Sequence, residues 1–201
     1  MSPAPYLLYL HGFRSSPRSF KARVVQEKLE QAGLGERLIC PQLPASPKAA
    51  MDLALGLVER HAPDNVAIVG SSLGGFYATW LAERLGVRAA VINPSVDPTR
   101  NLSKHVGVTT AWHSDEPFEF REEYVGELVE LRTERITRPE RYFLLAATGD
   151  EVLDYRDMVA HYAGARQHVI DGSDHAIPEF AQYVDEVLAF CGVDLKAGAA
   201  Q

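Results

Sequence analysis

Short apolar runs alternate with longer segments of helical periodicity along most of this 201-residue sequence. The apolar runs cover residues 6–10, 37–40, 65–70, 87–92, 142–147 and 167–170. The helical segments cover residues 18–32, 47–61, 73–85, 155–163 and 178–191. Runs that are apolar at nearly every position are typical of parallel strands buried on both faces, with helices as the crossover connections. The sequence therefore predicts the α/β class, with a mostly parallel central sheet between two layers of helices.

The length and charge of the chain narrow the function classes. One compact domain over residues 1–201 accounts for the whole length. The formal net charge of −7 argues against nucleic-acid or anionic-membrane partners, which require a dense basic surface. No apolar run is long enough to span a bilayer, and the N-terminus lacks the basic region of a signal peptide, so the expected location is the cytoplasm. Cys40 and Cys191 lie far apart in apolar contexts and are expected to be buried free thiols.

The alternation lapses in a polar, irregular insertion at about residues 95–138. An insertion of this length in a tight domain usually covers a site. Its aromatic residues Trp112, Phe118 and Phe120 are candidates for the wall of a substrate pocket, or they form a private core of the insertion.

One amphipathic helix is compatible with residues 122–131 of the insertion. In that helix Val125, Leu128 and Val129 would face the interior.

The segment Gly70-Ser71-Ser72-Leu73-Gly74 matches the pattern G-x-S-x-G at a point where an apolar strand turns directly into a helix. Small residues on both sides permit a sharp turn that presents the hydroxyl of Ser72 above the sheet. Because the helix N-terminus points at the site, the backbone amide of Leu73 becomes one donor to a developing oxyanion. The pattern indicates a serine nucleophile at Ser72.

Two other interpretations of this segment are weaker. Ser71 is also a serine, but it occupies a variable position of the pattern. A glycine-rich turn that cradles phosphate would need the lysine of a P-loop or the spacing G-x-G-x-x-G, and the sequence has neither.

A serine nucleophile needs a base, and in folds of this kind the order along the chain is Ser, then Asp or Glu, then His. Asp150 follows the strand at 142–147, and His175 follows the strand at 167–170. Both therefore lie at the carboxyl edge of the sheet, where the sites of open α/β sheets are found. Each residue alone is weak evidence, and the ordered set of three carries the prediction of a Ser72, Asp150 and His175 triad.

The alternatives to these partners remain open at this stage. Asp154 is the alternative acid, whereas Asp171 and Asp174 are expected to form turns. The remaining histidines have no comparable position for a base. They are His11, His61, His105, His113, His161 and His168.

The first predicted strand runs into His11-Gly12-Phe13, at the position from which such enzymes contribute a second oxyanion amide. The backbone amide of Phe13 is the candidate, although Gly12 could simply relieve strain in an ordinary turn. Arg14 is a candidate contact for an anionic group of the substrate, or it caps the surroundings of the first helix.

These motifs together resemble a known family, the bacterial YqiA-like esterases. The resemblance extends over nearly the whole chain and rests on residues 7–17, 70–79 and 148–155, the Asn93-Pro94 step and the Asp174-His175 pair. It implies a single-domain α/β-hydrolase fold with carboxylesterase or acyl-thioesterase activity, and it carries Ser72, Asp150 and His175 over as nucleophile, acid and base. The middle of the chain, residues 96–138, departs most from the family pattern.

The expected activity is cleavage of a small-molecule ester or acyl thioester through an acyl-enzyme, with no metal and no organic cofactor. A non-catalytic binding protein on the same scaffold is the main alternative, because fold does not fix function. Other chemistries of the same triad, such as amide cleavage or acyl transfer, also remain open. The oligomeric state is not predicted.

Overall fold

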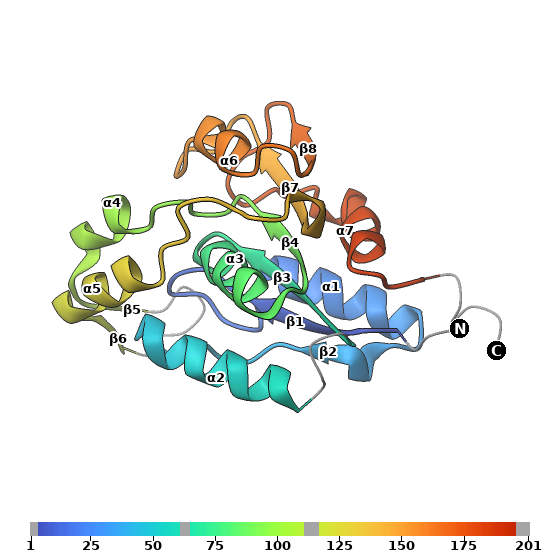
Figure 1. Cartoon of the computed structure of the whole chain (residues 1–201), viewed down its shortest axis with the longest axis horizontal. Helices are drawn as coiled ribbons and strands as arrows, with labels where there is room; N and C mark the ends of the chain where they lie inside the picture. Colours follow the sequence, from blue (N-terminus) through green and yellow to red (C-terminus); the bar gives the residue numbers. More distant parts are fainter. Residues whose placement is uncertain (1–3, 61–64, 111–116, 196–201) are drawn as a thin grey trace.

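The structure is a computed structural model that describes residues 4–60, 65–110 and 117–195. Six parallel strands form the central sheet in the order β2-β1-β3-β4-β7-β8 (Figure 1). Their bounds are β1 Tyr6–Leu10, β2 Leu38–Ile39, β3 Val66–Ser71, β4 Arg88–Ile92, β7 Tyr142–Ala147 and β8 Arg166–Ile170. The predicted α/β class and the parallel sheet are confirmed.

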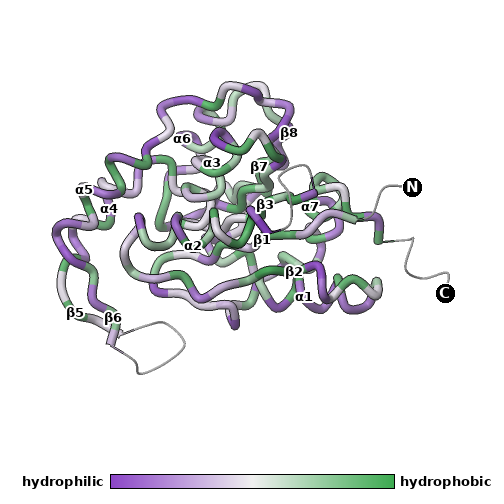
Figure 2. The backbone as a smooth tube through the Cα atoms, turned by 60° about the horizontal axis from the view of Figure 1, so that its bottom comes forward, coloured by the Kyte–Doolittle hydropathy of each residue, from purple (hydrophilic) through white to green (hydrophobic). Residues whose placement is uncertain are grey.

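The central strands carry apolar side chains on both faces, so helices cover both faces of the sheet. On one face, α1 (Phe20–Gln31) and α7 (Val184–Phe190) pack on Leu7, Tyr9 and Val69. On the other face, α2 (Pro47–Glu59), α3 (Leu73–Leu85) and α6 (Tyr155–His161) pack against alternate residues of the same strands. Hydrophobic stretches accordingly follow the strands through the middle of the molecule (Figure 2). The result is a single three-layer domain.

The insertion is more regular than predicted. It contains α4 (Thr99–Leu102), a 3-10 turn at Ser103–His105, the antiparallel hairpin of β5 (Gly107–Thr110) and β6 (Pro117–Phe120), and α5 (Glu122–Glu130). These elements gather at one end of the molecule, away from α7 (Figure 1). The hairpin was not visible in the sequence because the four-residue strands are too short to show a period.

The helix predicted at 122–131 is confirmed as α5, but its inward face was predicted in part wrongly. Leu128 is fully buried, and Tyr124 and Val125 pack on the core. Val129, by contrast, is 59% exposed. The buried stripe runs from Tyr124 to Leu128, which is the i, i+4 spacing of one helix face, and Val129 lies one residue outside it.

The helix predicted at 178–191 is also different. The segment begins with a 3-10 turn at Phe180–Gln182, and the α-helix proper starts at Val184. Such tightening is common at helix ends. Phe180 and Val184 are both fully buried, so the segment keeps its core face.

Candidate active site

Ser72 lies at the junction of β3 and α3 with φ 56° and ψ −121°, a backbone conformation that non-glycine residues rarely adopt. Gly70 and Gly74, two residues away on either side, permit this turn because they carry no Cβ. A Cβ on Gly70 would lie 2.2 Å from the carbonyl oxygen of Gly74, and one on Gly74 would lie 1.9 Å from the carbonyl oxygen of Leu10. The glycines of the motif are therefore required by close backbone packing, which holds Ser72 in a strained turn.

The structure brings Ser72, His175 and Asp150 into one hydrogen-bonded chain. Ser72 Oγ lies 3.1 Å from His175 Nε2, and His175 Nδ1 lies 2.7 Å from Asp150 Oδ2. Because an ionised carboxylate only accepts, Nδ1 carries the proton and Nε2 is left to accept from the serine hydroxyl. The Asp150 side chain is fully buried, whereas that of His175 is 21% exposed. This is the arrangement in which a neutral imidazole can take a proton from Ser72.

Asp150 is oriented by the loop that follows β7. Its Oδ1 accepts from the backbone N–H groups of Val152 and Leu153, each at 2.8 Å, which leaves Oδ2 for His175. The alternative acid, Asp154, is the N-cap of α6 and accepts from the N–H of Arg156 at 2.9 Å.

The side chains of the two remaining aspartates of these loops accept hydrogen bonds from other residues. Asp174 Oδ1 accepts from the N–H of Ile177, and Asp171 Oδ1 accepts from the hydroxyl of Thr148. Both side chains thus stabilise the turn after β8, as expected for turn-forming residues.

The main chain of His175 is held from several sides. Its N–H donates to Glu151 Oε2 at 3.0 Å, and its carbonyl accepts from Lys21 Nζ and from Asn93 Nδ2, both at 3.2 Å. Burial lowers the pKa of Lys21 to about 8, although the carboxylates of the site, first that of Asp150, oppose this shift.

The turn after β1 lies directly beside Ser72. A Cβ on Gly12 would be 3.2 Å from Ser72 Cβ, so glycine is required for this approach. His11, itself buried, fixes the turn: its Nε2 accepts from the N–H of Leu43 at 3.0 Å, and its Nδ1 donates to the carbonyl of Gly12 at 3.0 Å. Within the described residues, the N–H groups of Phe13 and Leu73 have no protein acceptor. Both amides therefore remain available to an oxyanion.

Ser72 and His175 line a cavity of about 590 Å³, a size typical of small-molecule sites. Much of its wall is apolar and includes Phe13, Phe20, Leu73, Pro98, Leu102, Val152 and Leu153. Leu102 and His105 come from the insertion, which therefore forms part of the wall. Within the described ranges, no group of three or more His, Cys, Asp or Glu side chains could hold a metal ion.

The three predicted substrate contacts have different positions. Arg14 lines the cavity, but its Nε donates to the carbonyl of Thr110 at 2.7 Å and so ties the turn after β1 to the β5–β6 hairpin. Phe118 packs edge-on against Phe13, with ring centroids 5.2 Å apart, instead of lining the cavity. Trp112 lies outside the described residues.

Two of the histidines that had no predicted catalytic position make contacts of other kinds. His168 Nδ1 lies 2.6 Å from Glu186 Oε2, and the ring of His105 packs against Phe13. His161 lies on α6. His61 and His113 lie outside the described residues.

Asn93 is the main site residue without a role in the sequence interpretation. It is fully buried at the end of β4, and its side chain joins the strand that precedes Asp150 to the loop that carries His175. The Asn93-Pro94 step marked a strand end at the same sheet edge. This was the one signal that could have indicated a role. Lys21 and Glu151 gave no signal because their contacts depend on residues far away in sequence.

A parallel sheet of this topology, with a strained serine between β3 and α3 and helices on both faces, defines the α/β-hydrolase fold. No helix of the described segments is long and apolar enough to cross a membrane.

The sequence matches a family model over residues 6–192, that of the uncharacterised protein family UPF0227. The chain therefore belongs to this family, which is the YqiA-like group that the motifs resemble.

Solved structures with low sequence identity share the fold. Alpha/beta hydrolase domain-containing protein 10 from mouse is 17% identical with a TM-score of 0.68, and the match covers 94% of this chain and 91% of that one. Est1E from Butyrivibrio proteoclasticus with bound ferulic acid is 16% identical with a TM-score of 0.68, covering 98% and 90%. A monoacylglycerol lipase from Paleococcus ferrophilus is 15% identical with a TM-score of 0.63, covering 93% and 96%.

Proposed function

We propose that this protein is a serine hydrolase that cleaves carboxylic esters or acyl thioesters. The observation that carries the proposal is the hydrogen-bonded chain from Ser72 through His175 to Asp150 at the wall of a cavity of about 590 Å³. The esterases and lipases among proteins of the same fold support it.

In the proposed mechanism, His175 Nε2 takes the proton of Ser72 as Oγ attacks the acyl carbon. The negative charge that develops on the carbonyl oxygen is stabilised by the N–H groups of Phe13 and Leu73 and by the N-terminus of α3. Asp150 holds the imidazole in the required tautomer and stabilises the imidazolium.

The tetrahedral intermediate collapses when the C–O or C–S bond to the leaving group breaks. The imidazolium of His175 returns its proton to the departing alcohol or thiol, which leaves the acyl group on Ser72 Oγ. A water molecule, deprotonated by His175 in the same way, then attacks the acyl-enzyme and releases the carboxylic acid with Ser72 restored.

The test is hydrolysis of a chain-length series of p-nitrophenyl esters and acyl-CoA thioesters by the wild type and by Ser72→Ala. We expect the wild type to be active and Ser72→Ala to lose at least about 10³-fold in kcat, with the fold intact by circular dichroism. The matched control is Ser71→Ala, the adjacent serine, which should keep labelling by a fluorophosphonate.

An inert wild type that no fluorophosphonate labels would refute the proposal and favour the non-catalytic binding protein. Labelling that survives Ser72→Ala but disappears in Ser71→Ala would instead show that Ser71 is the nucleophile and that the assignment of Ser72 is wrong.

A further inference from the structure

A second pocket of about 470 Å³ adjoins the cavity of Ser72. The two hollows share Ser95, Asn101, Val152 and Leu153 in their linings. The N–H of Ser95 also donates to the carbonyl of Ser72 at 3.0 Å, so this shared wall begins at the nucleophile itself. A substrate whose carbonyl lies at Ser72 therefore needs to extend only past these side chains to enter the second pocket.

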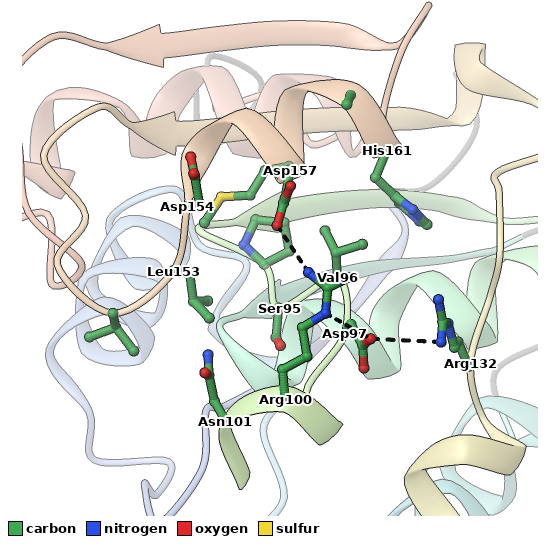
Figure 3. A pocket seen from close by; sticks show the side chains of 14 residues that line it. Ser95, Val96, Asp97, Arg100, Asn101, Arg132, Leu153, Asp154, Asp157 and His161 are labelled. Atoms are coloured by element: carbon green, nitrogen blue, oxygen red, sulfur yellow. Dashed lines mark ion pairs between the residues drawn. The ribbon is translucent and has the colours of Figure 1, made fainter.

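In the second pocket, side chains of opposite charge from separate segments are linked by ion pairs (Figure 3). Arg100 of α4 lies between two carboxylates: its Nε is 3.2 Å from Asp97 Oδ2, and its Nη1 is 3.6 Å from Asp157 Oδ2 of α6. Arg132, which follows α5, approaches Asp97 at 3.7 Å. The result is a network in which donors and acceptors alternate around the pocket.

The charges of this network nearly cancel. Asp97 and Asp157 pair with Arg100, and Asp97 also pairs with Arg132. Asp154, which lines the same pocket, pairs with Arg156. Burial lowers the pKa of His161, which disfavours a positive charge on this side chain.

A charged ligand group gains little from such a pocket. An anionic group meets a carboxylate beside each guanidinium, and a cationic group meets the reverse. Hydroxyl groups suit it better, because each can donate to a carboxylate and accept from a guanidinium at the same time. Arg100 and Asp157 are 68% and 63% exposed, so their ion pair is weak and can open to admit a ligand.

From this arrangement we propose that the second pocket binds the uncharged, hydroxyl-rich part of an ester, such as a sugar or another polyol, while the ester carbonyl lies at Ser72. This inference rests on the proposed hydrolase function and gives it a substrate class. The apolar wall around Ser72 accommodates the rest of the ester, and the ion-pair network selects the polyhydroxylated end.

The experiment compares two acetates that differ in their hydroxyl groups, 6-O-acetylglucose and cyclohexylmethyl acetate. For the wild type we expect kcat/KM to be about tenfold or more higher for the sugar ester, because hydrogen bonds to charged groups are among the stronger ones in proteins. Arg100→Met should abolish this preference and leave kcat/KM for p-nitrophenyl acetate within about twofold. Arg166→Met is the matched control: Arg166 is similarly exposed and paired, but it lines neither hollow.

The failures of the two proposals are distinguishable. If p-nitrophenyl acetate is cleaved but the two acetates have equal kcat/KM, the proposed pocket function is wrong and the hydrolase function stands. The pocket proposal would also be overturned if kcat/KM for an anionic ester such as monoethyl succinate exceeded that for 6-O-acetylglucose. If no ester is cleaved and no fluorophosphonate reacts, the hydrolase function fails and the pocket proposal fails with it.

Discussion

The side-chain amide of Asn93 donates to the main-chain carbonyl of His175, with Nδ2 and the oxygen 3.2 Å apart. The same amide donates to the carbonyl of Asp174 at 3.2 Å, while Asn93 Oδ1 accepts from the N–H of Ala147 at 2.8 Å. Asn93 is fully buried and has a φ of 40°, a region that asparagine tolerates better than most residues. A single side chain thus links the end of β7, which leads to Asp150, with the loop that carries His175.

Replacing Asn93 tests whether this link positions the base. For Asn93→Ala we expect kcat to fall about 10- to 100-fold with KM within about twofold, and the free energy of unfolding to fall by about 1–3 kcal/mol, because buried partners lose their hydrogen bonds. Asn93→Asp keeps the acceptor for Ala147 but loses the donor to the His175 loop, so kcat should fall there too. Steady-state kinetics and urea denaturation check both. Wild-type kcat in a folded Asn93→Asp protein would contradict the positioning role.

Two glycine-to-alanine substitutions should have opposite effects on stability. At Gly74 an added Cβ would lie 1.9 Å from the backbone oxygen of Leu10, which cannot move aside, so we expect loss of several kcal/mol or no soluble protein. At Gly56, inside α2, an added Cβ meets no atom within 4 Å. There we expect a gain of about 0.5–1 kcal/mol from helix propensity. Urea denaturation of both variants checks the pair, and a Gly74→Ala protein as stable as the wild type would refute the packing argument.

Lys21 should make the stability of the protein change with pH in the alkaline range. Burial lowers its pKa to about 8 in the folded state, against 10.5 for an ordinary lysine. Between these values the unfolded chain keeps a proton that the folded protein has released, so this group adds stability as the pH rises from about 8 to 10.5.

The comparison of Lys21→Met with the wild type isolates this contribution. Below pH 8 the wild type carries a buried charge, and the variant should have the higher Tm. That margin should shrink as the pH rises to 10, which thermal unfolding at pH 7, 8, 9 and 10 measures. A margin that stays constant or widens over this range would show that Lys21 is not desolvated as described.

Both cysteines should be inert toward thiol reagents in the folded protein. Cys191 is buried as predicted, whereas Cys40 is only partly buried. Burial raises the pKa of both thiols to about 12. At pH 8 only about one thiol in ten thousand would then be the reactive thiolate. Titration with dithionitrobenzoate should detect no thiol in the native protein and two in guanidinium chloride. Fast reaction of one thiol in the native protein would indicate that its site is open.

Much of the fold could be predicted because local patterns record it. The strand over Tyr6–Leu10 has the bounds that its apolar run predicts, and α3 begins and ends as expected, with Gly86 in the left-handed conformation directly after it. Local patterns failed where the period was short or ambiguous. The β5–β6 hairpin pairs strands of four residues, and Val129 lies just beside the buried stripe of α5.

The sequence by itself determined the kind of site, since the residue types, their order and their positions after strands are local properties of the chain. Only the tertiary structure decided which side chains meet. The strand order β3-β4-β7-β8 places the loops of Asp150 and His175 beside Ser72, and it encloses Asn93 between them. The tertiary structure also brought Arg100, Arg132 and Asp157 around one pocket. These contacts join residues far apart in the chain, and their distances depend on the packing of the whole sheet, which no local pattern encodes.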